Sequence, residues 1–237
     1  MPTSQLTKND SSVLSALFDP ESSLSSTVQV NDRSSTSSIS AKQRSLQERE
    51  RIGLRSINQE QPSSEEIQQS ISLLNTIIQD EPHYASAWNN RAQAYRLLIT
   101  DEDFSKNPLL VAEIFADLAQ AISLATPEKA STAVSSADAK VLASAHTHRG
   151  YLLLLASKSK GGRAMLSKIP GLRGMSVDDF EEAASRDLAM GGRYGNETAR
   201  QLAVKTNPYA KLCGSIVREA LTKEIADYYQ PQLHLAG

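Results

Sequence analysis

The sequence is poor in cysteine, since Cys213 is the only one among 237 residues. One cysteine excludes an intramolecular disulfide and argues against a cysteine-based zinc site. A reducing compartment suits such a chain, so we expect it in the cytoplasm, and also in the nucleus as a second location. Aromatic residues make up 5% of the chain and the formal net charge is −2, so no strong field favours nucleic acid as a partner.

Long apolar stretches are also missing. The longest unbroken one, residues 151–156, is far shorter than the roughly 20 residues that span a bilayer. Residues 1–20 contain no apolar segment of the kind found in secretion signals. We therefore predict that the chain has no membrane partner, and we expect it to be a monomer.

Motifs of familiar catalytic sites are absent as well. There is no glycine-rich loop before a Lys-Ser or Lys-Thr pair, no G-x-S-x-G and no H-E-x-x-H. His146 and His148 are two residues apart, so on a helix they point in different directions and cannot chelate one metal ion. Cys213 shares an apolar stripe with Ile216 and Leu221 and is expected in the core. We predict that the chain is not an enzyme and has no catalytic residue, metal site or cofactor.

Composition divides the chain into three parts. Residues 1–20 are predicted to form an N-terminal arm with a short amphipathic helix, and residues 21–40, dominated by Ser, a disordered linker. Residues 41–237 are predicted to form the folded domain. The arm either covers the domain as a lid or completes its core, and the sequence leaves both open. The apolar residues that share one face of the arm's helix are Val13, Leu14, Leu17 and Phe18.

From residue 41 onward, apolar residues recur at helical spacing between breakers such as Pro62 and Pro82. Helices without strands favour an all-α fold of antiparallel hairpins, packed as a bundle or as a solenoid. The helices that we predict are Ala41–Gln59, Glu65–Gln79, Ala85–Leu98, Leu109–Leu124, Asp138–Ser157, Val177–Ala189 and Glu197–Thr206, with a final helix from Pro208 to about Tyr228.

One segment favours a solenoid of tetratricopeptide (TPR) repeats. Trp88, Ala92 and Tyr95 have the spacing of the large, small and aromatic residues of the TPR pattern. Pro82, six residues earlier, ends the preceding helix. In this pattern the small residue lets two helices approach closely, while the aromatic side chains fill the groove to the next repeat.

Weaker copies of the pattern flank this segment. In the third copy, Gly150 takes the place of the small residue. Residues 98–108 and 157–176 are longer than the loops of a standard repeat, and we interpret them as insertions. We predict that residues 41–237 form three imperfect TPR-type repeats in a short right-handed solenoid with C-terminal capping helices.

Six short segments carry a more specific resemblance. They are residues 13–20 (VLSALFDP), 87–97 (AWNNRAQAYRL), 148–150 (HRG), 179–184 (DFEEAA), 199–202 (ARQL) and 207–213 (NPYAKLC). With these segments in this order, the chain resembles the tetratricopeptide repeat protein 36 family of small three-repeat proteins. The resemblance implies binding to heat-shock protein 70 chaperones. It also implies a role in regulating tyrosine metabolism, through protection of the enzyme hydroxyphenylpyruvate dioxygenase.

TPR domains bind partners in a concave groove lined by the first helix of each repeat. Some chaperone-binding members hold a C-terminal carboxylate there with two Lys, two Asn and one Arg. Asn90 matches one Asn, but Ser144 and His148 stand where a Lys and an Arg belong, so a complete clamp is not expected. The residues predicted to line the partner-binding groove are Arg55, Gln59, Asn89, Asn90, Gln93, Arg96, His148 and Arg149.

The second insertion contains a basic run without an acid between Ser157 and Met175, which either binds an anionic partner or forms a solvated loop. We predict an interaction scaffold or co-chaperone-like adaptor. Two alternatives remain open. A structural subunit requires a broad apolar patch on one flank, and an unfamiliar helical enzyme requires polar groups that converge in a closed pocket. The basic residues are Lys158, Lys160, Arg163, Lys168 and Arg173.

Overall fold

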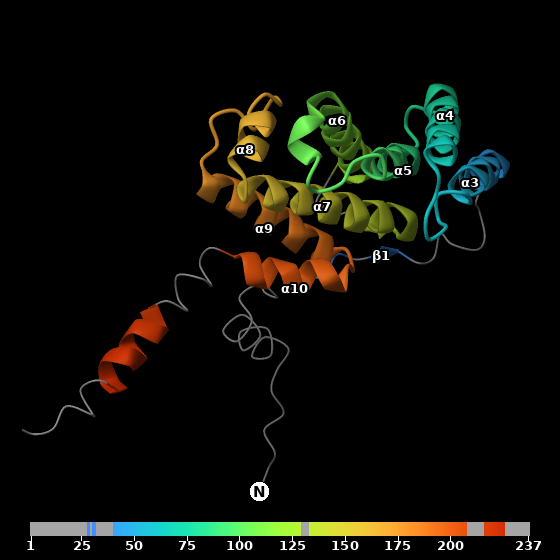
Figure 1. The fold of residues 1–237 in the computed structure, drawn as a ribbon. Helices are drawn as coiled ribbons and strands as arrows, with labels where there is room; N and C mark the ends of the chain where they lie inside the picture. Colours follow the sequence, from blue (N-terminus) through green and yellow to red (C-terminus); the bar gives the residue numbers. More distant parts are fainter. Residues whose placement is uncertain (1–27, 29, 32–39, 129–132, 208–215, 226–237) are drawn as a thin grey trace, which may run out of the picture.

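A computed structural model describes residues 28, 30–31, 40–128, 133–207 and 216–225. Most of these residues are helical, and most helices from α3 to α10 pack against the next helix along the chain (Figure 1). The predicted all-α class is therefore confirmed, while the predicted helix of the N-terminal arm lies outside the described residues. The elements are β1 (Val30–Asn31), α3 (Ala41–Leu54), α4 (Ser64–Asp80), α5 (Ala85–Arg96), the 3₁₀ helix η2 (Phe104–Lys106), α6 (Pro108–Ala125), β2 (Val134–Ser135), α7 (Ser136–Ser157), α8 (Lys160–Leu166), α9 (Val177–Arg193) and α10 (Glu197–Thr206).

Short polar side chains set where several helices begin. At the start of α4, the Ser63 hydroxyl accepts a hydrogen bond from the Glu66 N–H at 3.2 Å, and the Glu66 carboxylate accepts one from the Ser63 N–H at 2.8 Å. Ser176 and Asp179 form the same reciprocal cap at the start of α9. Each cap satisfies N–H groups that have no partner inside the helix. α6 begins instead with Pro108, whose missing N–H would be unpaired at this position anyway.

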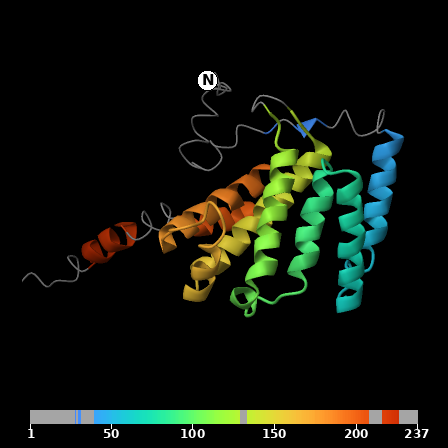
Figure 2. The same ribbon diagram turned by 90° about the horizontal axis from the view of Figure 1, so that it is seen from above.

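From α3 to α7 each helix contacts the next along the chain, while α8 and α9 both pack against α7 and α10 packs against α9. In Figure 2, α3, α4, α5 and α6 stand side by side, and α7 and α9 are turned relative to them. Side-chain hydrogen bonds join α3 to α5 and α5 to α7. The first helices of three successive pairs therefore share one surface, which we call the α3–α5–α7 face.

The apolar core consists of two larger clusters that meet at α5. Leu74 and Ile77 of α4 belong to one cluster, and Leu118 and Leu142 belong to the other; all four are fully buried. Trp88 of α5 packs against both clusters, so this side chain connects the two halves of the core, as the repeat pattern predicts.

Small residues allow neighbouring helices to approach closely. Ala92 of α5 is fully buried. At Gly150 of α7, an added Cβ would lie 2.9 Å from the Leu188 Cγ and 3.0 Å from the Ala184 carbonyl oxygen of α9. Only glycine fits this contact without a shift of the backbone, which confirms Gly150 as the small residue of the third repeat-like pair.

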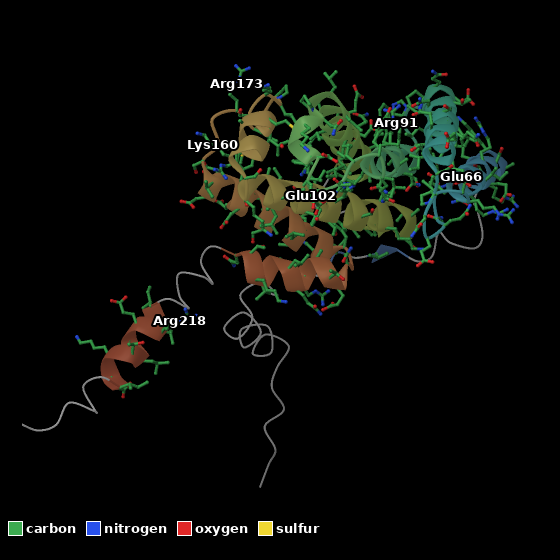
Figure 3. All side chains as sticks on the ribbon, viewed as in Figure 1. Glu66, Arg91, Glu102, Lys160, Arg173 and Arg218 are labelled. Atoms are coloured by element: carbon green, nitrogen blue, oxygen red, sulfur yellow. The ribbon has the colours of Figure 1, made fainter. Side chains whose placement is uncertain are left out.

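A buried ion pair fixes α5 to α6. The Arg91 guanidinium donates to the two carboxylate oxygens of Asp117 at 2.8 and 2.6 Å and to the Asn75 side chain of α4 at 2.7 Å. It also lies over the rings of Trp88, at 4.9 Å, and Tyr95, at 5.8 Å. Because Asp117 is 1% exposed, this cluster is part of the core rather than a surface contact. Figure 3 labels Arg91 near the junction of α4 and α5.

α6 is long and apolar enough to span a membrane by length and composition alone. In this fold, however, Val111, Ile114 and Leu118 are fully buried against neighbouring helices. The same helix carries the ion-paired Asp117. We therefore assign α6 to the protein core.

Several predicted helix ends differ from the structure by one to five residues, and one helix was not predicted. α3 ends at Leu54 rather than at Gln59, because the chain turns after Leu54 and buries Ile57 in the cluster with α4. The insertion after α7 is not only a loop, since it contains α8.

Within the segment 21–40, which was predicted to be a disordered linker, the described residues 30–31 have a regular backbone structure. Val30–Asn31 pairs in parallel with Val134–Ser135 as a two-stranded ladder, and Val28 packs against the larger core cluster. Val28 therefore packs on the folded domain and Val30 pairs only through its backbone, a placement that composition alone did not reveal.

The predicted C-terminal capping helix is described only over residues 216–225. These residues are helical, but Ile216, Val217 and Leu221 are exposed, so the expectation that this stripe belongs to the core is wrong. Cys213, which was expected in the same stripe, lies outside the described residues.

Candidate functional site

The α3–α5–α7 face carries two adjoining hollows. The first hollow, of ≈ 880 Å³, lies between α3, α5 and the start of α7 and includes Glu50 and Asn90. The second hollow, of ≈ 900 Å³, lies between α5, α7 and the start of α10 and includes Arg96 and His148. The residues that line both hollows are Gln93, Lys140 and Ser144.

Glu50 organises the first hollow. Its buried carboxylate accepts hydrogen bonds from the Asn90 side chain at 2.8 Å and from the Tyr84 hydroxyl at 2.7 Å. Burial and the neighbouring Glu50 charge raise the pKa of Tyr84, so the hydroxyl keeps its proton and remains a donor. Because Glu50 belongs to α3 and Asn90 to α5, this network also holds the two helices together.

A second polar network closes one end of the second hollow. Arg96 pairs with Asp101 and donates to the Ile99 carbonyl, and Asp101 also accepts from the Tyr151 hydroxyl. His148 lies beside this network, and neither of its ring nitrogens has a hydrogen-bond partner among the described residues. Burial and then the charge of Arg96 lower the pKa of His148 to about 4, so the ring is neutral at pH 7.

Gln93 lies between the two networks, where the hollows meet. Its amide nitrogen donates to the Ser144 hydroxyl at 2.7 Å, which joins α5 to α7. Gln93 and Lys140 are exposed, and neither belongs to a core cluster. These side chains can therefore contact a ligand without being needed for the packing of the helices.

The structure brings four of the predicted groove residues together on this face: Asn90, Gln93, Arg96 and His148 line one hollow or both. Asn89 also lines the first hollow, but it is 4% exposed and its amide donates to the Asn90 side chain at 3.3 Å. Asn89 therefore supports Asn90 from within the helix packing.

Three predicted groove residues lie elsewhere. Arg55 follows the end of α3, and Gln59 lies in the next turn, where its amide donates to Glu66 at 3.4 Å. Both were placed on the assumption that the first helix extends to Gln59, which the structure contradicts. Arg149 points toward α9, where it donates to the two carboxylate oxygens of Asp187 at 2.7 Å.

Asp187 is the centre of a structural network between α7 and α9. His146 donates to the same carboxylate at 2.8 Å, and its ring stacks on Tyr194 with the centroids 6.2 Å apart. Burial alone would raise the pKa of Asp187, but Arg149 and His146 hold it below its ordinary value. His146 thus faces α9 while His148 lines the second hollow, in agreement with the prediction that the two rings point in different directions.

Sequence reasoning missed Glu50, Lys140 and Tyr151. Glu50 lies in a segment rich in both charge signs, which conceals the face that points inward. Tyr151 follows His148 by three residues, the spacing of neighbours on one helix face, so this signal was present in the sequence.

The face offers amides, hydroxyls and charges of both signs from three helices, a set that suits hydrogen bonding to a polypeptide segment. It does not suit a carboxylate clamp. The Asn90 amide is already engaged by the Glu50 carboxylate, and a second carboxylate beside Glu50 would be repelled.

No family model matches the chain, and no solved structure matches it. The L-tyrosine degradation gene cluster protein hmgX of Aspergillus fumigatus is 46% identical over 239 residues, which cover 93% of this chain and 93% of that protein. Tetratricopeptide repeat protein 36 of Danio rerio is 32% identical over 142 residues, or 60% of this chain and 54% of that protein. A homolog of the latter from Drosophila melanogaster is 31% identical over 136 residues, or 57% and 51%.

The matches to the two animal proteins span about half of their length. They confirm the resemblance to tetratricopeptide repeat protein 36 as a distant relationship. The match to the Aspergillus protein extends over nearly the whole of both chains. The chain belongs to the family of the L-tyrosine degradation gene cluster protein hmgX.

Proposed function

We propose that this chain is a protein-interaction module of the TPR type whose partner binds on the α3–α5–α7 face. In this proposal α3/α4, α5/α6 and α7/α9 are three repeats of a short right-handed solenoid, and α10 follows them. The observation that carries the proposal is the face itself. The first helices of three successive pairs contribute polar side chains to the two adjoining hollows, α3 to the first hollow and α5 and α7 to both. Gln93 and Lys140 remain exposed where the hollows meet.

We further propose that the partner is a protein of L-tyrosine degradation. The name of the Aspergillus relative and the relationship to tetratricopeptide repeat protein 36 support this role. Hydroxyphenylpyruvate dioxygenase, the enzyme that the resemblance implies, is the first candidate. In this role the chain is a cytoplasmic adaptor rather than a catalyst.

A heat-shock protein 70 chaperone is the second partner class, and its proposed mode of binding differs from a carboxylate clamp. Glu50 places a negative charge beside Asn90, so a C-terminal carboxylate gains little there. The chaperone would instead contact the junction of the hollows near Gln93 and Lys140.

Binding of hydroxyphenylpyruvate dioxygenase, measured by isothermal titration calorimetry, tests the proposed face. A Gln93→Ala/Lys140→Glu variant should bind at least about tenfold more weakly, which corresponds to roughly 1.4 kcal/mol. Its thermal melt should stay close to that of the wild type, because neither residue belongs to the core and the Gln93–Ser144 hydrogen bond that is lost is exposed. The matched control is Gln69→Ala/Ser72→Glu, two exposed positions of α4 that line neither hollow.

Unchanged affinity in the groove variant, with weaker binding in the control, would reject the α3–α5–α7 face as the site. The chaperone proposal is tested with heat-shock protein 70 and a version that lacks its last residues. Equal affinity for both supports the proposed mode, whereas loss of binding to the shortened chaperone shows that a terminal carboxylate is recognised after all.

A further inference from the structure

A separate groove, of ≈ 790 Å³, lies between α6 and α9, and residues of α7 and of the α8 region complete its lining. We call it the α6–α9 groove. It shares no residue with the two hollows of the α3–α5–α7 face. Leu109 at its edge is 84% exposed, which is unusual for a leucine in a helix of a folded domain. The apolar residues that characterise the lining are Leu109, Ala116, Leu153, Ile169, Leu172 and Ala183.

The chain also contains an apolar helix face without a described contact. Residues 216–225 form ten residues of helix, about 15 Å in length. The part of α6 that lines the groove, from Leu109 to Ala119, has a similar length. Four apolar residues of the helix fall on one side at 3.6 residues per turn, and each is between 52% and 57% exposed. They are Ile216, Val217, Leu221 and Ile225.

This helix can reach the α6–α9 groove of its own chain. The Ser185 hydroxyl of α9 donates to the Ala203 carbonyl of α10 at 3.4 Å, so the end of α10 lies against this part of α9. Ala183 and Arg186, in the same turn of α9, line the groove. The connecting residues 208–215 can span about 30 Å when extended, so the tether allows the contact.

One acid interrupts the apolar face of the helix. Glu224 lies four residues after Ala220 and three after Leu221, so its carboxylate belongs to the same side. A carboxylate that is carried into an apolar groove loses hydration, and a cation in the groove offsets part of that loss.

The groove offers one such cation. Arg149 and Arg186 each pair with an acid, on α9 in both cases. Glu113, also in the lining, interacts electrostatically with Arg91. Lys168 lines the groove and has no ion pair among the described residues. It belongs to a basic run that contains no acid, and Figure 3 shows two other members, Lys160 and Arg173, at the α8 end of the molecule.

We propose that the helix of residues 216–225 docks its apolar face into the α6–α9 groove of its own chain, with the Glu224 carboxylate facing the Lys168 ammonium group. The C-terminal helix then covers an apolar surface that would otherwise face water, and the α3–α5–α7 face stays free for a partner. This assignment does not rest on the proposed function.

Cysteine trapping tests the docking in the full chain. Because Cys213 is the only cysteine, a Cys213→Ser background contains none. In that background, Ala220→Cys is combined in turn with Ala112→Cys and Ala116→Cys of the groove, and the chain is mildly oxidised. Docking brings one of these pairs within disulfide distance, so at least one should give an intrachain cross-link, seen as a faster-migrating monomer without reductant. The matched control pairs Ala220→Cys with Ser72→Cys on α4 and should give none.

Charge reversal then tests the orientation. Glu224→Lys should lower the trapped fraction about fivefold, and adding Lys168→Glu should restore it. Trapping no greater than in the Ser72 control overturns the docking. Cross-linked dimers as the sole product identify a second copy as the occupant and overturn the assignment to the same chain. A trapped fraction that is the same with and without the two charge reversals overturns the contact between Glu224 and Lys168.

Discussion

Replacement of Arg91 by Met tests how the core joins α4, α5 and α6. Methionine keeps most of the side-chain volume but removes the charge, so Asp117 is left buried without its cation. Breaking a buried ion pair by removing one partner costs about 3–5 kcal/mol. The bond from Arg91 to Asn75 and the contacts with Trp88 and Tyr95 are lost as well, so we expect a loss near the upper end of this range.

The pH dependence of this loss has a defined sign. Burial already raises the pKa of Asp117, and Arg91 opposes that rise. Without Arg91 the folded-state pKa increases further above the unfolded value. A carboxyl group with a raised folded-state pKa lowers the unfolding free energy at neutral pH, where it is ionised. This loss of stability disappears as the pH falls below the unfolded-state pKa of about 4. Arg91→Met should therefore be closer to the wild type at about pH 4 than at pH 7.

A second substitution separates the charge from the packing. Arg91→Met/Asp117→Leu replaces the ion pair by apolar side chains, which is often neutral or stabilising, so most of the loss should be recovered. Urea unfolding followed by the fluorescence of Trp88, the only tryptophan of the chain, and by circular dichroism measures all three forms. A single-variant loss below about 1 kcal/mol, or a loss that does not change with pH, would refute a buried and functional ion pair.

Three further predictions concern single side chains. Gly150→Ala should cost about 1–3 kcal/mol because its Cβ meets α9, whereas Gly161→Ala, whose Cβ would lie 3.4 Å from Ser105, should leave the thermal melt nearly unchanged. His148 has a lowered pKa of about 4, so the unfolded chain gains a proton first on acidification. When the pH falls from about 6.5 to about 4, the unfolding free energy of the wild type should therefore decrease by up to about 3 kcal/mol through this group. The His148→Leu variant lacks the group and should not show this part of the decrease. Trp88→Ala should lower the unfolding free energy by about 3 kcal/mol, since the indole packs against both core clusters.

Helix interiors were predictable because their packing follows local spacing. Trp88, Ala92 and Gly150 were placed from the repeat pattern, and the structure uses all three at contacts between helices. The end of the first helix was not predictable from spacing, because Ile57 continues the apolar pattern beyond Leu54. Ile57 is buried in the cluster with α4, but the chain reaches this position through an irregular turn and not through a continuation of α3.

A glycine can end a helix, or it can allow two helices to approach closely. The sequence alone did not show which of these applies at Gly161-Gly162. Two adjacent glycines are weak helix formers, and they lie in the segment 157–176 that we interpreted as an insertion, yet both residues belong to α8. An added Cβ at Gly162 would lie 2.9 Å from the Ala156 Cα. Glycine therefore serves close contact between α8 and the end of α7, while the Ser159 hydroxyl caps the helix at 2.9 Å from the Gly162 nitrogen.

Candidate site residues were predictable where they share a helix with the repeat motif. Asn90, Gln93 and Arg96 follow from the position of Trp88 on α5. Which residues of α3 face α5 depends on where α3 ends. Because α3 was predicted to continue to Gln59, Arg55 was placed on the face instead of Glu50. Long side chains on α7 raised the same difficulty, since Arg149 is adjacent to His148 in sequence but bonds to α9 instead.

Glu50, rather than the predicted Arg55, occupies this place on the α3–α5–α7 face. The difference in charge changes how the face can bind a partner. A cation at this place would attract an anionic ligand. The Glu50 carboxylate instead accepts hydrogen bonds from Asn90 and Tyr84, so these donors are already paired. To use Asn90, a ligand must first break a hydrogen bond to a buried carboxylate, which costs more than an exposed contact returns. In the proposed function, recognition therefore falls to the exposed side chains at the junction of the hollows, Gln93 and Lys140. Asn90 and Glu50 hold α3 against α5 so that these side chains keep their positions.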